Sequence, residues 1–309
     1  MMDIREAEHS TPEPDTNMLP RIRSPLIRLG NLFPNREVYA KCEFLAPSGC
    51  FKIRGAVHLL EHLRQAGGSR PLIVPSMGNT AIGAGTAAKA YGTAMVGVVP
   101  RTISAAKDER LRALGVDLIK IKGGGSDLLR RAKEVASERN GYFVHPHLDP
   151  LWTDGYQTIA EEILEEIPDC RSLVFPLGGG GLLLGLSEYL LKHAAPVQLY
   201  GCEPYNYPKY ARFMHQRSQT IADGLMLEVP HSPVRERIDS LGISVDMVQE
   251  SDIGTAMRDL FDKQALVVEP SSAISIPFVA SHEELAEPIC VIQTGGNITR
   301  EHFDQLLSM

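Results

Sequence analysis

Two kinds of hydrophobic pattern alternate along this chain. Short runs of β-branched and other apolar residues predict strands, and segments whose apolar residues recur every three or four positions predict helices. Residues 51–65, for example, place Ile53, Ala56, Leu60 and Leu63 on one side of a helix. Because predicted strands and helices follow one another at short intervals, we expect an α/β fold of mostly parallel sheets covered by helices.

The predicted strands are residues 38–42, 72–74, 94–99, 116–121, 142–144, 173–177, 198–202, 266–268 and 289–293. The predicted helices are residues 51–65, 79–91, 104–115, 126–140, 158–167, 182–192, 274–280 and a closing helix from 299. Ser104 and Ser126 are the expected N-caps of two of these helices. The segment 205–250 and its flank carry prolines at 204, 208, 230 and 233, so we expect it to be irregular and to line a site.

Composition and charge narrow the class of protein. The chain has 309 residues, 43% hydrophobic and 22% charged, with a net charge of −7, which argues against a nucleic-acid-binding surface. The most apolar stretch, Leu173–Leu186, is too short and too rich in glycine to cross a membrane. The five cysteines lack CxxC spacing, which argues against a disulfide framework and a zinc site. The acidic N-terminus does not resemble a signal peptide, so we expect a cytoplasmic protein with no membrane partner.

Four consecutive glycines, Gly178–Gly181, follow one predicted strand and precede a helix. Backbone without side chains at a helix N-terminus presents several N–H groups to an anion, and the helix dipole adds to the attraction. A tight turn would need only one or two glycines, so the run favours a phosphate site. It is not a P-loop, because no Gly-Lys-Ser/Thr follows.

Lys52 follows a glycine-bearing turn and lies among apolar neighbours at the start of a predicted helix. A desolvated lysine loses proton affinity and becomes a nucleophile that forms imines. Alone, Lys52 would be interpreted as an ordinary surface lysine. Together with a phosphate loop it indicates a cofactor that carries both an aldehyde and a phosphate.

Other loops fit such a site. Residues Ser76–Thr80 precede a helix, so their N–H groups and hydroxyls are candidates to bind a substrate carboxylate. Thr294 ends the last long strand, on the side of an open α/β sheet where ligands bind, although a turn-stabilising role is equally possible at this stage. Gly83 and Gly85 match a dinucleotide motif, but they fall inside a helix, where they permit close packing instead.

Six motifs in this order resemble the serine/threonine dehydratase and serine racemase branch of the fold-type II pyridoxal-phosphate enzymes. They are Ser48–Ala56, Ser76–Thr80, Gly178–Gly181, Thr220–Gly224, Glu269–Ala273 and Thr294–Asn297. The resemblance implies a tryptophan synthase β-like fold with two open, twisted, parallel-sheet domains and pyridoxal 5′-phosphate between them. The large domain would comprise residues 1–69 and 148–309, and the small domain residues 70–147.

The same resemblance implies roles for individual residues. Lys52 would be the catalytic, Schiff-base lysine, and Thr294 would stand where the family usually has a serine that faces the pyridine nitrogen. The implied cofactor-binding set is Phe51, Lys52, Asn79, Gly178, Gly179, Gly180, Gly181, Leu182, Glu269 and Thr294. The implied substrate-binding set is Ser76, Met77, Gly78, Asn79, Thr80, His147 and Tyr156.

The implied reaction is α,β-elimination from a β-hydroxy amino acid, such as L-threonine or L-serine, through a Lys52 aldimine, to give a 2-oxo acid and ammonia. Met77 stands where racemases of the family carry a serine that transfers a proton, so racemisation is expected to be weak. The Asn79-Thr80 pair is more like the cysteine synthases, which keeps open a β-replacement synthase (cysteine synthase-like or diaminopropionate synthase-like) that acts on an activated serine. A cofactor-binding protein without catalysis is a third alternative.

Two further expectations follow from the resemblance. Glu203 matches the first carboxylate of a cation site found in some relatives, but the second acidic position falls near Lys209, so we expect no metal. Family members commonly form homodimers, and a small-molecule amino acid is the expected substrate.

Overall fold

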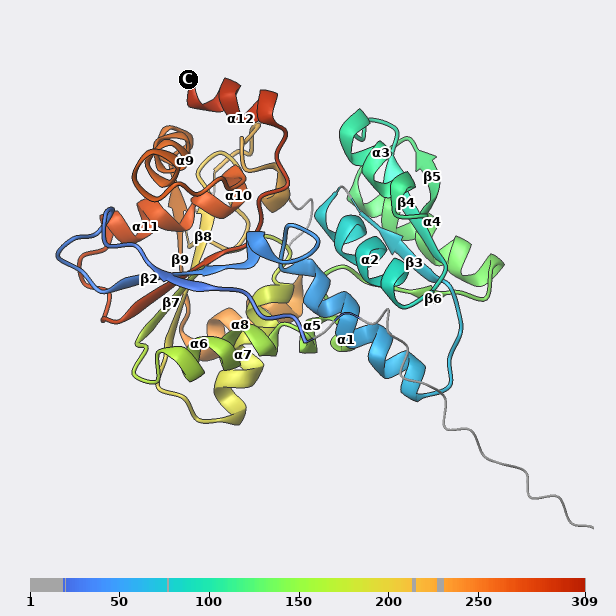
Figure 1. Ribbon diagram of the computed structural model, residues 1–309, viewed down its shortest axis with the longest axis horizontal. Helices are drawn as coiled ribbons and strands as arrows, with labels where there is room; N and C mark the ends of the chain where they lie inside the picture. The colour runs from blue at the N-terminus through green and yellow to red at the C-terminus, as the bar shows by residue number, and fades with distance from the viewer. Residues whose placement is uncertain (1–18, 20, 77, 213–214, 227–230, 309) are drawn as a thin grey trace, which may run out of the picture.

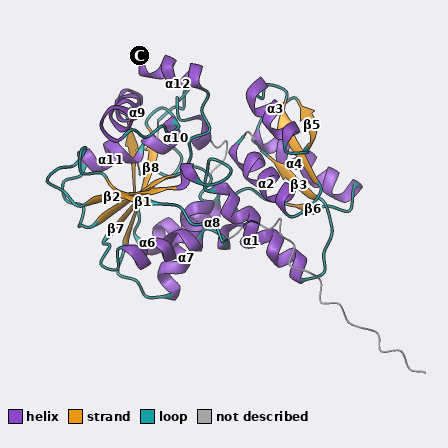
Figure 2. Ribbon diagram, viewed as in Figure 1, coloured by secondary structure: helices purple, strands orange, loops and turns teal. Residues whose placement is uncertain are grey.

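The computed structural model describes residues 19, 21–76, 78–212, 215–226 and 231–308. Its strands form two separate sheets that helices surround (Figures 1 and 2). The six-stranded sheet has the order β1-β2-β10-β7-β8-β9, and the four-stranded sheet has the order β5-β4-β3-β6. Every neighbouring pair is parallel except β1 with β2. The predicted α/β fold with mostly parallel sheets is therefore confirmed.

The strands are β1 Leu26–Arg28, β2 Val38–Cys42, β3 Leu72–Pro75, β4 Met95–Pro100, β5 Asp117–Ile121, β6 Tyr142–Phe143, β7 Ser172–Pro176, β8 Gln198–Pro204, β9 Ser244–Val248 and β10 Ile289–Gln293. The α-helices are α1 Lys52–Gln65, α2 Asn79–Ala90, α3 Ala105–Ala113, α4 Gly125–Glu138, α5 Pro150–Asp154, α6 Gln157–Glu166, α7 Gly181–Lys192, α8 Ser232–Leu241, α9 Glu250–Gln264, α10 Pro270–Ala273, α11 Ser275–Ser281 and α12 Arg300–Leu307. Two short 3-10 helices are η1 Glu43–Leu45 and η2 Asp223–Leu225.

Both faces of each sheet are covered, which explains why the strands contain few polar residues. In β7, Leu173 and Phe175 belong to the core cluster that includes residues of α6 and α7, whereas Val174 between them belongs to the cluster on the α9 and α11 side. In β3, Leu72 packs on the side of α1 and α2, and Ile73 packs against α4. Figure 1 shows α6 and α7 on one side of the six-stranded sheet and α9 and α11 on the other.

Helix α1 links the two sheets and carries Lys52 as its first residue. It packs against α2 of the four-stranded unit and against α5 of the six-stranded unit. Two residues further along, Arg54 donates to Glu43 (2.8 Å) and Glu162 (2.7 Å) with all three side chains buried. Lys41 completes this buried network at 2.7 Å from Glu162. The network anchors the first turn of α1 to the six-stranded unit.

Three predictions of local structure were wrong, one of them only in part. Residues 266–268 form a loop, and Leu266 N donates to Leu260 O at the end of α9 instead of to a neighbouring strand. The segment 205–250 is irregular only in its first part, because α8 and β9 follow, with Pro233 in the first turn of α8, where a proline costs no hydrogen bond. Tyr207, Asp223 and His231 from the first part line the cavity between the two sheets, as predicted for this segment. Helix α4 has Gly124 as its N-cap, so Ser126 lies inside the helix. The Ser104 cap is confirmed, because its hydroxyl accepts from Lys107 N.

The cysteines, which all lie in the described ranges, form no disulfide bonds, which fits the lack of a disulfide framework in the sequence. Cys42, Cys50, Cys170, Cys202 and Cys290 are all buried free thiols. Among the residues that the structure describes, no helix has both the length and the apolar character needed for a membrane span.

Candidate active site

A cavity of about 340 Å³ lies between the two sheets. Its walls include Ser76 after β3, Leu177 after β7 and Thr294 after β10, so it lies at the carboxyl ends of parallel strands. Ligands bind at this edge in open α/β sheets, because loops and helix N-termini meet there. Of the predicted site residues, the cavity is lined by Phe51, Lys52, Ser76, Gly78, Asn79, Thr80, His147, Gly178, Gly179, Gly180, Gly181, Leu182, Glu269 and Thr294.

Lys52 presents its amine to this cavity. The turn before it is fixed to the end of β10, because Phe51 N donates to Thr294 O (3.0 Å) and Cys50 forms a β-bridge with Gly295. The Lys52 Nζ lies 4.4 Å from the centre of the Phe51 ring. Burial lowers the pKa of Lys52 to about 8, so near neutral pH a larger fraction of this amine is unprotonated than in an exposed lysine.

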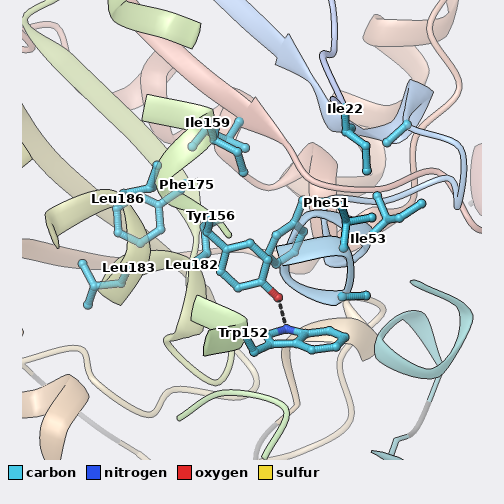
Figure 3. Packing of buried hydrophobic residues seen from close by; sticks show 14 of the residues in the cluster. Ile22, Phe51, Ile53, Trp152, Tyr156, Ile159, Phe175, Leu182, Leu183 and Leu186 are labelled. Atoms are coloured by element: carbon cyan, nitrogen blue, oxygen red, sulfur yellow. Dashed lines mark hydrogen bonds between the residues drawn. The ribbon is translucent and has the colours of Figure 1, made fainter. Parts of the chain in front are cut away.

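Tyr156 lies behind Phe51 and not on the cavity wall. The two ring centres are 4.8 Å apart, and the indole Nε1 of Trp152 donates to the Tyr156 hydroxyl (Figure 3). Both Tyr156 and Trp152 are fully buried, and neither is among the residues that line the cavity. Tyr156, predicted to bind substrate, therefore packs against Phe51 and does not line the cavity. These rings hold Phe51 in place.

The four glycines form the turn between β7 and α7. Gly180 has a left-handed backbone (φ 86°), which favours glycine. Within the described chain, the N–H groups of Gly178, Gly179, Gly180 and Gly181 meet no backbone or side-chain acceptor. The loop therefore presents uncommitted donors to the cavity at the N-terminus of a twelve-residue helix, which suits a phosphate.

His147 packs directly against this loop, because a Cβ at Gly179 would lie 2.2 Å from the His147 ring. Its ring centre is 5.6 Å from that of His231, which also lines the cavity. Burial, together with the nearby Lys52 and His231, lowers the pKa of His147 well below its usual range. The imidazole is therefore neutral at physiological pH.

The N-terminus of α2 forms another wall. The Ser76 hydroxyl accepts hydrogen bonds from Gly78 N and Ala81 N, each 3.0 Å long, and so caps this helix. Thr80 lies in the first turn and is 7% exposed. Met77, predicted in the same loop, lies outside the described residues. The helix end combines N–H groups and hydroxyls, which are groups that bind a carboxylate.

Asn79 and Glu269 meet at the same wall. The Asn79 amide donates to Glu269 Oε1 (2.7 Å) and accepts from Asn297 Nδ2 (2.9 Å). Burial raises the pKa of Glu269 to about 7. Thr294 lies beside them at the end of β10 and is 6% exposed. The wall therefore offers amide, carboxyl and hydroxyl groups close to the Lys52 amine.

Other cavity residues were not among the predicted sites. They are Lys107, Ser126, Tyr207, Asp223 and His231, among others, with Lys107 Nζ 3.5 Å from Asp223 Oδ2. One signal was present in the sequence, because Gly123–Gly125 lies between β5 and α4 just as the four glycines lie between β7 and α7. Nothing local marks Lys107 or His231, since only the packing of distant segments brings them to the cavity.

A cavity between two parallel sheets, with a buried amine and a glycine loop for a phosphate, defines a class of cofactor-dependent enzyme. The sequence matches the model of the pyridoxal-phosphate dependent enzyme family over residues 18–295. The chain belongs to this family, and its fold is fold-type II. Pyridoxal phosphate is the cofactor of the family, and the Lys52 amine, with its lowered pKa, and the free N–H groups of Gly178–Gly181 fit its aldehyde and its phosphate.

Several characterised proteins are similar to this chain. The L-threonine ammonia-lyase of Thermotoga maritima is 30% identical over 88% of this chain and 70% of its own length. Human serine racemase is 28% identical over 96% of this chain and 88% of its own length. The structure of maize serine racemase superposes with a TM-score of 0.82 at 26% identity, covering 93% of this chain and 92% of that chain.

Proposed function

We propose that this protein is a pyridoxal-phosphate-dependent ammonia-lyase that converts a β-hydroxy amino acid, such as L-threonine or L-serine, to a 2-oxo acid and ammonia. The observation that carries the proposal is the Lys52 amine, with its pKa lowered to about 8, in one cavity with a glycine loop and a helix N-terminus. The similarity to an L-threonine ammonia-lyase and to a catabolic L-threonine dehydratase of Staphylococcus aureus supports the lyase assignment.

The cofactor would be held by residues from several elements. Lys52 would bind it covalently, and Gly178–Gly181 with Leu182 would bind the phosphate through backbone N–H groups. Phe51 would stack near the ring, Asn79 would donate to the 3′-oxygen with Glu269 holding its amide, and Thr294 would face the ring nitrogen. When bound, the cofactor supplies an electron sink for the pair released at the substrate Cα.

The substrate would lie on the side of α2. The N-terminal end of this helix would hold the carboxylate by the N–H groups of Asn79 and Thr80 and by the hydroxyls of Ser76 and Thr80, with Gly78 in the same loop. Met77 belongs to the same proposed loop by sequence. The neutral His147 ring would bound the cavity on the side of the glycine loop and offer a hydrogen bond without adding charge.

Lys52 would also move the proton on which the reaction depends. With its amine freed by the incoming substrate amine, Lys52 would take the proton from the substrate Cα, and the electron pair of that bond would then form the Cα–Cβ double bond. The Cβ–O bond would then break, and the hydroxyl would leave as water with a proton that the Lys52 ammonium returns. The released enamine tautomerises to an imine, which one water molecule hydrolyses to the 2-oxo acid and ammonia.

The organisation that goes with this function is also part of the proposal. Residues 70–147, which contain the four-stranded sheet, would form a small domain, and residues 1–69 with 148–309 would form the large domain. The cofactor would sit between them, near the start of α1. We further propose that the enzyme acts in the cytoplasm as a homodimer.

The deciding experiment measures 2-oxo acid release from L-serine, D-serine, L-threonine, 3-hydroxyaspartate, 3-phenylserine and O-phosphoserine with cofactor supplied. Rapid release from a β-hydroxy substrate, lost in Lys52→Ala, is the expected result. If the hydroxy amino acids are inert while an O-activated serine and added sulfide give a new amino acid, the enzyme is a β-replacement synthase and the proposal is wrong.

A further inference from the structure

Both ends of the Asn79 side-chain amide form hydrogen bonds. Its Nδ2 donates to Glu269 Oε1 (2.7 Å), and its Oδ1 accepts from Asn297 Nδ2 (2.9 Å). These two bonds fix which end of the carboxamide carries the donor, since a flipped amide would face Asn297 with its own N–H group. One N–H of Asn79 is then left for a ligand at the cavity wall.

Asn297 is oriented in turn by a residue far from the cavity centre. Arg110 Nη1 donates to Asn297 Oδ1 (2.6 Å), and Arg110 Nη2 donates to the carbonyl of Ser48 (2.9 Å). Asn297 Nδ2 also reaches the Ser48 carbonyl at 3.2 Å. Gly49 makes room for this contact, because a Cβ there would lie 2.3 Å from Asn297 Oδ1. The guanidinium fork thus holds the acceptor end of Asn297, so that its donor end faces Asn79.

The hydrogen bonds form one continuous chain, Arg110 to Asn297 to Asn79 to Glu269, with a cation at one end and a carboxyl group at the other. The chain crosses between the two sheet units three times, because Arg110 and Asn79 lie on α3 and α2, whereas Asn297 and Glu269 flank the six-stranded sheet. Hydrogen bonds in such a series polarise one another.

We propose that Arg110 is a positioning residue of the cofactor site, which acts through Asn297 to hold the Asn79 amide in the orientation that binds the cofactor. This inference rests on the proposed role of Asn79 toward the cofactor. A planar fork is required, since two acceptors, Asn297 Oδ1 and the Ser48 carbonyl, must be met at once. A lysine ammonium, as a point donor, would satisfy the pair less well.

The test compares Arg110→Met, Arg110→Lys and Arg112→Met. Arg112→Met is a matched control, because this substitution removes the same charge from α3. Among the described residues, the Arg112 side chain pairs only with Asp108, one turn away. Cofactor release from the holoenzyme is followed by its absorbance, and thermal unfolding is measured in parallel. We expect the dissociation constant of the cofactor to rise about fivefold in Arg110→Met, by a smaller factor in Arg110→Lys, and not at all in Arg112→Met.

A double-mutant comparison separates positioning from simple packing. If Arg110 acts through Asn297, then Arg110→Met adds little to the loss of cofactor affinity already caused by Asn297→Ala. Unchanged cofactor affinity in Arg110→Met, or strictly additive effects in the double variant, would overturn the inference. The readout does not depend on the reaction, so a wild-type enzyme that binds cofactor but releases no 2-oxo acid would refute only the proposed function.

Discussion

Gly83 of α2 lies directly against Lys52 of α1: a Cβ at residue 83 would lie 2.8 Å from the Lys52 Cβ and 2.9 Å from the Ile53 backbone nitrogen. The absence of a side chain at this one position lets α2 approach the residue that carries the amine. The helix N-terminus proposed to bind substrate and the lysine proposed to act on it are therefore brought together by a packing contact.

We expect Gly83→Ala to lower 2-oxo acid release by about 10- to 100-fold, because the two helices must separate and a small displacement of a reacting group is costly. Gly254→Ala is the control, since Gly254 also lies in a helix but a Cβ there would meet nothing within 4 Å. That variant should gain up to about 1 kcal/mol of stability without loss of activity. Full activity in Gly83→Ala would show that the contact does not position Lys52.

The lowered pKa of Lys52 predicts how cofactor uptake depends on pH. The unprotonated amine is the nucleophile, so the rate of cofactor capture by the apoenzyme should rise with pH and level off above about 8. Stopped-flow absorbance measures this rate. Glu269 has a pKa of about 7, so Glu269→Gln is the necessary control, and the rise near pH 8 should persist in it. If the rise with pH disappears in Glu269→Gln, the titrating group is Glu269 and the prediction for Lys52 is wrong.

A substitution in the loop Gly178–Gly181 should lower both the stability of the fold and the affinity for the cofactor. Gly180→Ala places a side chain in the left-handed region, at a cost of about 1–2 kcal/mol, and drives its Cβ to 2.3 Å from Val234. Gly30→Ala, where a Cβ would meet nothing within 4 Å, should leave both properties unchanged. Thermal unfolding and cofactor dissociation measure the effects. Wild-type affinity in Gly180→Ala would contradict a phosphate role for this loop.

The buried network around α1 predicts a pH-dependent stability. Burial alone would raise the pKa of Glu162, but hydrogen bonds from Arg54 and Lys41 outweigh it, so the pKa lies below its usual value. A carboxyl group with a lowered pKa stabilises the fold above its unfolded pKa, and this contribution is lost as the pH falls through the folded value. Glu162→Gln should therefore cost about 3–5 kcal/mol at pH 7, since it leaves buried cations unpaired.

The difference in the free energy of unfolding between wild type and Glu162→Gln should shrink in acid, as denaturant titrations at pH 7 and in the acid range can measure. The neighbouring Glu161 pairs with Arg21 at the surface, so Glu161→Gln should change stability by less than about 1 kcal/mol. A Glu162→Gln penalty that does not change with pH would rule out the ionised carboxylate as its source.

The buried ion pair of Glu203 and Lys209 predicts that the activity does not depend on a divalent metal ion. Lys209 Nζ lies 3.3 Å from Glu203 Oε1 with both side chains fully buried, and the backbone N–H groups of Lys209, Tyr210 and Ala211 donate to the same carboxylate. The ammonium balances the charge of Glu203, so we predict that a chelator leaves activity unchanged and that added Mg²⁺ or Ca²⁺ does not raise it. Activity that falls with chelator and returns with Mg²⁺ would refute this prediction.

Much of the site could be predicted because its chemistry depends on residue types at fixed local spacings. The lysine after a glycine turn and the four glycines between a strand and a helix are local patterns, and both line the cavity. The position of Tyr156 could not be predicted in this way, and this residue does not line the cavity. Its distance in sequence from the cavity loops is no guide to whether it faces the cavity, and it packs behind Phe51 instead.

The strand–helix alternation, the parallel sheets and the positions of Lys52 and the four glycines at the starts of helices could be predicted from the sequence, since period, turn residues and helix ends are local properties. The tertiary structure was needed to show that Lys107 and His231 join this cavity and that Arg110 reaches Asn297, because these residues come from segments distant in sequence. Only the tertiary structure gave Lys52 its lowered pKa, because desolvation depends on which distant segments close around the amine.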